Sequence, residues 1–86
     1  MPQPIPPDRI PLTQLAPGEQ STVAELRGGR SFVSRLATLG FTPGALLTVV
    51  QNYGRGPIIV RVRNTRIALG RGEALKVQVR KTSERG

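Results

Sequence analysis

The sequence contains no cysteine, no histidine and no tryptophan. Without thiols there are no disulfide bonds and no cysteine nucleophile, and without imidazoles there is no histidine base or histidine metal ligand. Five carboxylates remain as hard metal ligands, and they are scattered along the chain: Asp8, Glu19, Glu25, Glu73 and Glu84. We therefore expect no metal site, no cofactor and no enzymatic activity.

Aromatic residues make up only 3% of the chain, and long hydrophobic runs are missing. No apolar stretch approaches the roughly 20 residues that cross a bilayer, and the N-terminus lacks the basic and apolar regions of a secretion signal. These patterns predict a cytoplasmic protein. With 86 residues, 37% of them hydrophobic, the chain is long enough for one domain with an aliphatic core.

Negative charge is also scarce. Thirteen Lys and Arg residues against five Asp and Glu residues give a formal net charge of +8, and eleven of the thirteen cations are Arg. Such an excess predicts an acidic partner: nucleic acid, an anionic membrane surface or an acidic protein face. A solvated basic surface that keeps a small protein soluble explains the same charge, and composition alone leaves both interpretations open.

The two ends of the chain are expected to be flexible tails. Five prolines fall within the first eleven residues, where they remove backbone donors and favour extended conformers. We therefore assign residues 1–9 to a Pro-rich tail, residues 10–80 to one domain and residues 81–86 to a polar C-terminal tail.

Within the domain, residues 30–39 are predicted to form a helix, because apolar residues recur at one helical face and Ser31 can serve as its N-cap. Short strands are expected over residues 19–26, 45–51, 58–63, 66–69 and 75–80, with a tight turn at Asn64 and Thr65. In the last strand, Leu75, Val77 and Val79 should face inward and Lys76, Gln78 and Arg80 outward. Five strands with one helix after the first favour a mainly β, SH3-like small barrel.

The segment "RLATLGFTPGALLTVVQN" is dense in local signals. If the helix ends at Leu39, Gly40 adopts a left-handed conformation and Phe41 packs back on Leu36. Thr42, Pro43, Gly44 and Ala45 then fit a type II turn. Structural roles are therefore assigned to Leu36, Gly40, Phe41, Pro43 and Gly44.

The order of these segments resembles the FeoA family of ferrous iron transport proteins. The resemblance covers about residues 10–79 and rests on "PLTQLAPGEQSTVAEL", a Gly-Gly pair, "RLATLGFTPGALLTVV" and "PIIVRVRNTRIALGRGEALKVQV". It implies an SH3-like barrel with an inserted helix. It also implies a cytoplasmic accessory of bacterial iron uptake, acting on the cytoplasmic part of the membrane GTPase and permease FeoB and so located at the inner membrane through that partner.

The family is also described as binding transition metals and as occurring at the C-terminus of iron-dependent repressors. This chain departs from the repressor setting because it has no helix-turn-helix and no metal-ligand cluster. Without His and Cys, only scattered carboxylates remain for binding iron directly.

A partner-binding surface is expected on the basic strands, because the planar guanidinium pairs with carboxylates and phosphates in two-point geometry. The candidate residues are Arg61, Arg63, Arg66, Lys76 and Arg80, with Arg55 between Gly54 and Gly56 as a second contact. Alternating charges also mark the solvent side of ordinary strands, so the pattern is equally consistent with a surface that binds no partner.

Two other functions compete with this interpretation. Nucleic-acid binding normally stacks bases on aromatic side chains, and only Tyr53 is free for that role. A self-associating adaptor would pair an edge strand with a neighbouring copy. The glycine-rich stretches "NYGRGP" and "LGRGEA" lack a phosphate-binding pattern and are interpreted as turns.

Overall fold

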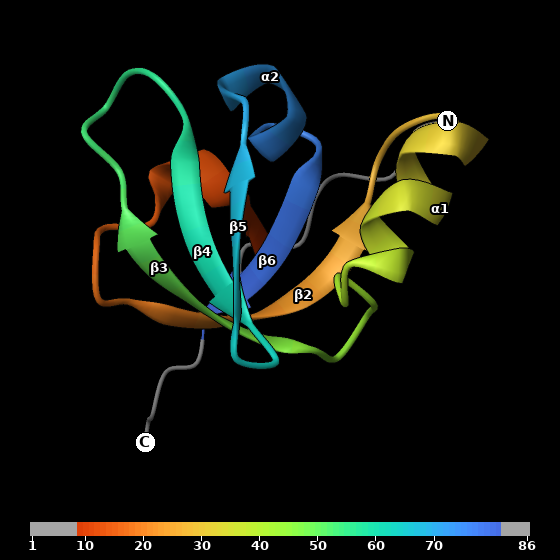
Figure 1. Cartoon of the computed structure of the whole chain (residues 1–86), viewed down its shortest axis with the longest axis horizontal. Helices are drawn as coiled ribbons and strands as arrows, with labels where there is room; N and C mark the ends of the chain where they lie inside the picture. The colour runs from red at the N-terminus through yellow and green to blue at the C-terminus, as the bar shows by residue number, and fades with distance from the viewer. Residues whose placement is uncertain (1–8, 82–86) are drawn as a thin grey trace.

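Six antiparallel strands form one sheet in the computed structural model, which describes residues 9–81 (Figure 1). In chain order they are β1 (Arg9–Pro11), β2 (Gln20–Leu26), β3 (Leu46–Gln51), β4 (Ile58–Val62), β5 (Thr65–Leu69) and β6 (Val77–Lys81). Their order across the sheet is β1-β6-β2-β3-β4-β5, so β1 and β5 are the end strands.

Three helical segments join these strands. Helix α1 (Arg30–Thr38) follows β2, while the single turns η1 (Leu12–Gln14) and α2 (Arg71–Ala74) follow β1 and β5. The expected mainly β class, with a short helix after the first long strand, is confirmed. No helix within residues 9–81 has both the length and the apolar character needed to cross a membrane.

The sheet curves around an aliphatic core (Figure 1). Alternate residues of each long strand point inward, so Val60 and Val62 are fully buried while Arg61 between them is exposed. Phe41 is the largest fully buried side chain, and Leu36 of α1 lies in the same core. Residues of the helix end therefore close one side of the curved sheet.

The predicted end of α1 is confirmed. Leu39 is its C-cap, and the N–H groups of Gly40 and Phe41 donate to the carbonyls of Ala37 and Leu36 at 3.0 and 2.9 Å. This is the double bond pattern of a Schellman ending, with Gly40 at φ +105°.

The turn after α1 is confirmed as well. The N–H of Ala45 donates to the carbonyl of Thr42 at 2.9 Å, and Gly44 has φ +94°, as a type II turn around Pro43 and Gly44 requires. The N-cap prediction is wrong, because Gly29 precedes the helix and makes no side-chain cap.

One strand, β1, was not predicted from the sequence. Arg9, expected to belong to the tail, begins β1, which pairs with β6. Pro11 lies at the end of this end strand, where a missing N–H costs no ladder bond, so the prolines did not prevent pairing. The remaining residues of both predicted tails, 1–8 and 82–86, lie outside the described part of the chain, and Lys81 belongs to β6.

The turn between β4 and β5 lies one residue earlier than predicted. Val62 pairs with Thr65, which leaves Arg63 and Asn64 as the two turn residues. Both have positive φ, 52° and 66°, as a type I′ turn requires to match the twist of its strands. Arg63 therefore belongs to the turn and not to the face of β4.

The last predicted strand begins too early. Residues 71–74 form α2, whose C-cap is Leu75, and Leu75 is therefore exposed instead of facing inward. Gln78 was expected at the surface but is buried, and its cross-strand neighbours on the same face are Pro11 of β1 and Glu25 of β2. The inward orientation of Val77 and Val79 is confirmed.

Candidate partner-binding surface

Arg61 of β4 and Arg66 of β5 are direct cross-strand partners. The two-residue turn makes Val62 and Thr65 a hydrogen-bonded pair, so the next pair, Arg61 with Arg66, is of the non-hydrogen-bonded kind in which side chains approach most closely. Both side chains lie on the exposed outer face. Like charges in this relationship repel each other and destabilise the pair.

Arg63 adds a third guanidinium at the tip of this hairpin. Its backbone is held at φ +52°, a conformation that a non-glycine residue adopts at a cost. Arg63 and Asn64 also line a shallow groove of about 310 Å³ beside β3. We call β4, β5 and their turn, with Arg61, Arg63 and Arg66, the arginine hairpin.

The groove combines apolar and cationic walls. It is lined by Ala45, Leu46, Thr48, Arg61, Arg63 and Asn64. Leu46 is 53% exposed, a large fraction for a leucine next to a folded core. This arrangement can hold an apolar side chain against Leu46 while guanidinium groups pair with nearby carboxylates.

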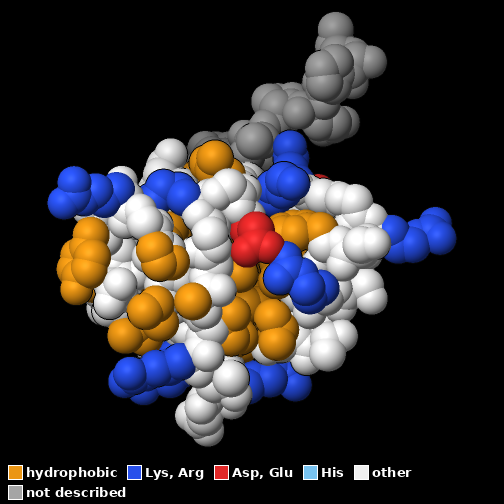
Figure 2. All heavy atoms as spheres, turned by 45° about the horizontal axis from the view of Figure 1, so that its top comes forward, with side chains coloured by type: hydrophobic (Ala, Val, Ile, Leu, Met, Phe, Trp, Pro, Cys, Tyr) orange, Lys and Arg blue, Asp and Glu red, His pale blue; other side chains and the backbone are white. Residues whose placement is uncertain are grey.

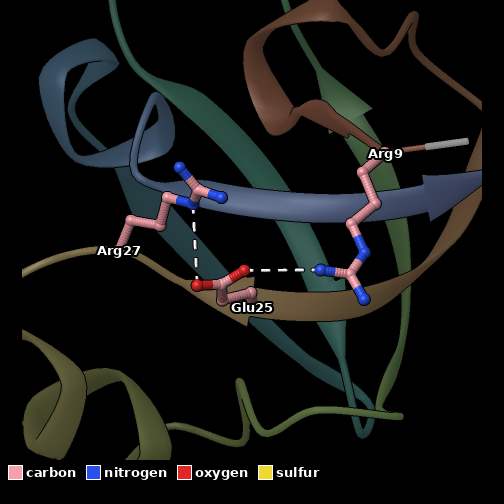
Figure 3. A network of polar contacts seen from close by, with 3 residues as sticks. All are labelled: Arg9, Glu25 and Arg27. Atoms are coloured by element: carbon pink, nitrogen blue, oxygen red, sulfur yellow. Dashed lines mark hydrogen bonds and ion pairs between the residues drawn. The ribbon is translucent and has the colours of Figure 1, made fainter. Parts of the chain in front are cut away.

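The acidic side chains of the described residues are engaged elsewhere. Arg9 and Arg27 both approach Glu25, with N–O distances of 3.4 and 3.6 Å (Figure 3), and Arg35 of α1 pairs with Glu73 of α2. Within residues 9–81, no ion pair reaches the arginine hairpin. Its positive charge is therefore available to a partner.

Positive charge dominates more of the surface than the hairpin alone. On the face shown in Figure 2, Lys and Arg side chains lie around the edge and also near the middle, hydrophobic side chains lie between them, and little acidic surface is visible. An anionic partner would therefore be attracted to the molecule at long range and oriented by local contacts.

The remaining predicted contact residues are not part of the arginine hairpin. Lys76 follows α2, with its Nζ atom 5.3 Å from the centroid of the Phe32 ring. Arg80 lies in β6, which β2 and β3 separate from β4. Arg55 is exposed in the loop between β3 and β4. The structure therefore brings together three of the six predicted residues.

Asn52 anchors the loop between β3 and β4, a role that was not predicted from the sequence. Asn52 donates to the carbonyls of Thr13 and Leu15 at 3.1 and 2.8 Å, and its Oδ1 accepts from Gly54 at 3.0 Å and from Arg71 at 2.7 Å. The amide thereby uses both donors and both lone pairs. The spacing of Asn52 and Gly54 is typical of an Asx turn and was a visible signal, but the distant partners were not.

The described part of the chain offers no set of ligands for a metal ion. Within residues 9–81, no three carboxylates come together. Glu19 Oε1 accepts the N–H of Ala16 at 2.6 Å, and the carboxylates of Glu25 and Glu73 face arginines. Hydrogen bonds from Arg35 and from the N–H of Gly70 hold the pKa of Glu73 below its usual value of 4.5. Each of these carboxylates is thus satisfied by a protein donor.

The FeoA domain family profile matches residues 10–81 of this chain, which is nearly the whole described domain. The chain belongs to this family. It is 35% identical over 69 residues to a candidate Fe(2+) transport protein A of Methanocaldococcus jannaschii, covering 80% of this chain and 83% of that protein. It is also 32% identical over 69 residues to a fusion of Fe(2+) transport protein A with the Fe(2+) transporter FeoB in Porphyromonas gingivalis, covering 79% of this chain and 8% of the fusion.

Solved structures of FeoA proteins share the fold. A crystal structure of an iron uptake regulatory protein, FeoA, superposes with a TM-score of 0.80 and 38% identity, covering 85% of this chain and 97% of that one. The zinc complex of Stenotrophomonas maltophilia FeoA, described as an SH3 domain protein, gives a TM-score of 0.73 and 29% identity, covering 81% of this chain and 88% of that one. The expected SH3-like architecture is thereby confirmed.

Proposed function

We propose that this FeoA protein is an accessory of ferrous iron transport that associates with a FeoB-type transporter. Family membership supports the transport role, and the Porphyromonas gingivalis relative carries an FeoA segment and FeoB in one chain. Covalent fusion keeps two domains at a high effective concentration, which is useful to partners that must contact each other. The protein acts by binding and catalyses no reaction.

The arginine hairpin is the surface we assign to this contact, and the cytoplasmic GTPase part of the transporter is the partner. The observation that carries the assignment is the juxtaposition of Arg61, Arg63 and Arg66, which have no acidic partner within residues 9–81, with a groove that exposes Leu46. An acidic surface with a protruding apolar side chain would neutralise the charges and cover the leucine. The protein would then lie at the cytoplasmic side of the membrane.

A capture experiment tests this proposal. The immobilised protein is expected to retain the purified cytoplasmic part of FeoB from the same organism, and the Arg61→Glu/Arg63→Glu variant should retain much less. Arg27→Glu/Arg30→Glu is the matched control, because it changes the net charge equally at Arg27, which follows β2, and at Arg30, the first residue of α1. Equal retention by the two double variants would remove the hairpin from the contact. No retention by the parent protein would refute the association itself.

A further inference from the structure

The free edge of β5 offers a second kind of contact, made by the backbone. β5 ends the strand order, and β4 is its partner in the described sheet. Thr65, Ile67 and Leu69 occupy the hydrogen-bonded positions opposite β4, because pairing starts at the two-residue turn. The N–H and C=O groups of the alternate residues, Arg66 and Ala68, therefore point to the open edge, where both residues are exposed.

The positive charge of Arg66 limits which strands can pair with the edge of β5. Charged residues on an end strand normally prevent it from pairing with copies of itself. A second copy of this chain, with a net charge of +8, would bring further positive charge to Arg66, which already faces Arg61. A strand that carries carboxylates would instead relieve that repulsion.

We propose that the edge of β5 binds an extended acidic segment of a partner protein, which joins the sheet as an additional antiparallel strand. Its backbone would exchange hydrogen bonds with Arg66 and Ala68, and carboxylates at the two facing positions would lie on the outer face beside the guanidinium of Arg66. This inference rests on the proposed function, whose partner it describes as offering an acidic strand. It adds a binding mode that the groove alone does not require.

A synthetic peptide in which Glu alternates with Thr and Val is a suitable probe, with a Lys-for-Glu peptide as its counterpart. The Glu peptide should bind by fluorescence anisotropy, and the Lys peptide should not. In the proposed complex the backbone N–H groups of the Glu residues point toward β5, so N-methylation of these nitrogens should abolish binding. Methylation of the intervening residues should leave it intact. Equal loss from both sets of methyl groups would overturn the strand-addition mode.

Ala68→Pro tests the same mode from the protein's side. The N–H of Ala68 points away from β4, so proline removes an edge donor without removing a ladder bond, and the variant should fold. Loss of the edge bonds should weaken peptide binding by about tenfold or more, whereas Ala68→Ser keeps the donor and should bind like the parent. Unchanged binding by a folded Ala68→Pro variant would refute the proposal.

Two further measurements separate this inference from the proposed function. If Arg61→Glu/Arg63→Glu weakens retention of the FeoB cytoplasmic part and Ala68→Pro does not, strand addition is refuted and the proposed function stands. If the parent protein does not retain the FeoB cytoplasmic part, the proposed function is refuted. An oligonucleotide probe that binds the edge more tightly than the Glu peptide, with Arg66→Glu abolishing and Arg30→Glu preserving its binding, would overturn the choice of a protein ligand.

Discussion

Gly40, the first residue after the C-cap of α1, lies against Val62 of β4. A Cβ atom on Gly40 would lie 3.1 Å from Val62 Cγ1, and the glycine has φ +105°. Two independent constraints therefore favour glycine at this position: the left-handed backbone that ends the helix and the close approach of the hairpin strand.

Gly40→Ala should lower the free energy of unfolding by about 2–4 kcal/mol, the sum of left-handed strain and steric overlap. Gly44 provides the control, because it has φ +94° but a Cβ atom added there would meet no other atom within 4 Å. Gly44→Ala should therefore cost only about 1–2 kcal/mol. Chemical denaturation measures both values, and equal losses would contradict the role of Val62.

Asn52→Ala should destabilise the protein by about 2–3 kcal/mol, since it leaves two carbonyls, the N–H of Gly54 and a nitrogen of Arg71 without their partner. The loop between β3 and β4 should also open more readily. Hydrogen exchange at Gly54 reports this opening. If the amide of Gly54 keeps its protection in the variant, Asn52 is not the anchor of the loop.

The ion pair between Arg35 and Glu73 should make stability depend on pH in the acid range. The folded pKa of Glu73 lies below 4.5, so its contribution is complete above that value and is lost as the pH falls through the folded pKa. Glu73→Gln should therefore lower stability at neutral pH, and the difference from the parent should shrink toward pH ~3. Denaturation curves at both pH values test this, and Arg35→Gln should produce no further loss in the Glu73→Gln background.

Arg66→Glu should raise stability while it impairs binding. The substitution replaces a repulsive cross-strand pair with an attractive one next to Arg61, a gain of up to about 1 kcal/mol that salt should diminish. The same change reverses the charge of the proposed β5 edge, so the acidic peptide should no longer bind. Melting temperatures at low and high salt measure the first effect. A variant that is less stable than the parent at low salt would show that the two arginines do not repel each other.

Local signals explain why much of the fold could be predicted. The helix end and the following turn lie within the ten residues from Leu36 to Ala45, and their bonds join residues at most five apart. Inward and outward positions of β4 follow from the alternation of valine with arginine. Two corrections depended on distant contacts: β1 exists because it pairs with β6, and Gln78 is buried in a strand that lies between β1 and β2.

The sequence by itself determined the fold class, the end of α1 and the presence of arginines on the hairpin, because each depends on periodicity or on the conformational range of Gly and Pro. Only the tertiary structure decided which arginines meet. A turn at Asn64 and Thr65 would have placed Arg63 opposite Arg66, whereas the turn at Arg63 and Asn64 places Arg61 there. Strand register depends on turn geometry to within one residue, and strand order, which separates Arg80 from the hairpin, is set by pairing between segments far apart in the chain.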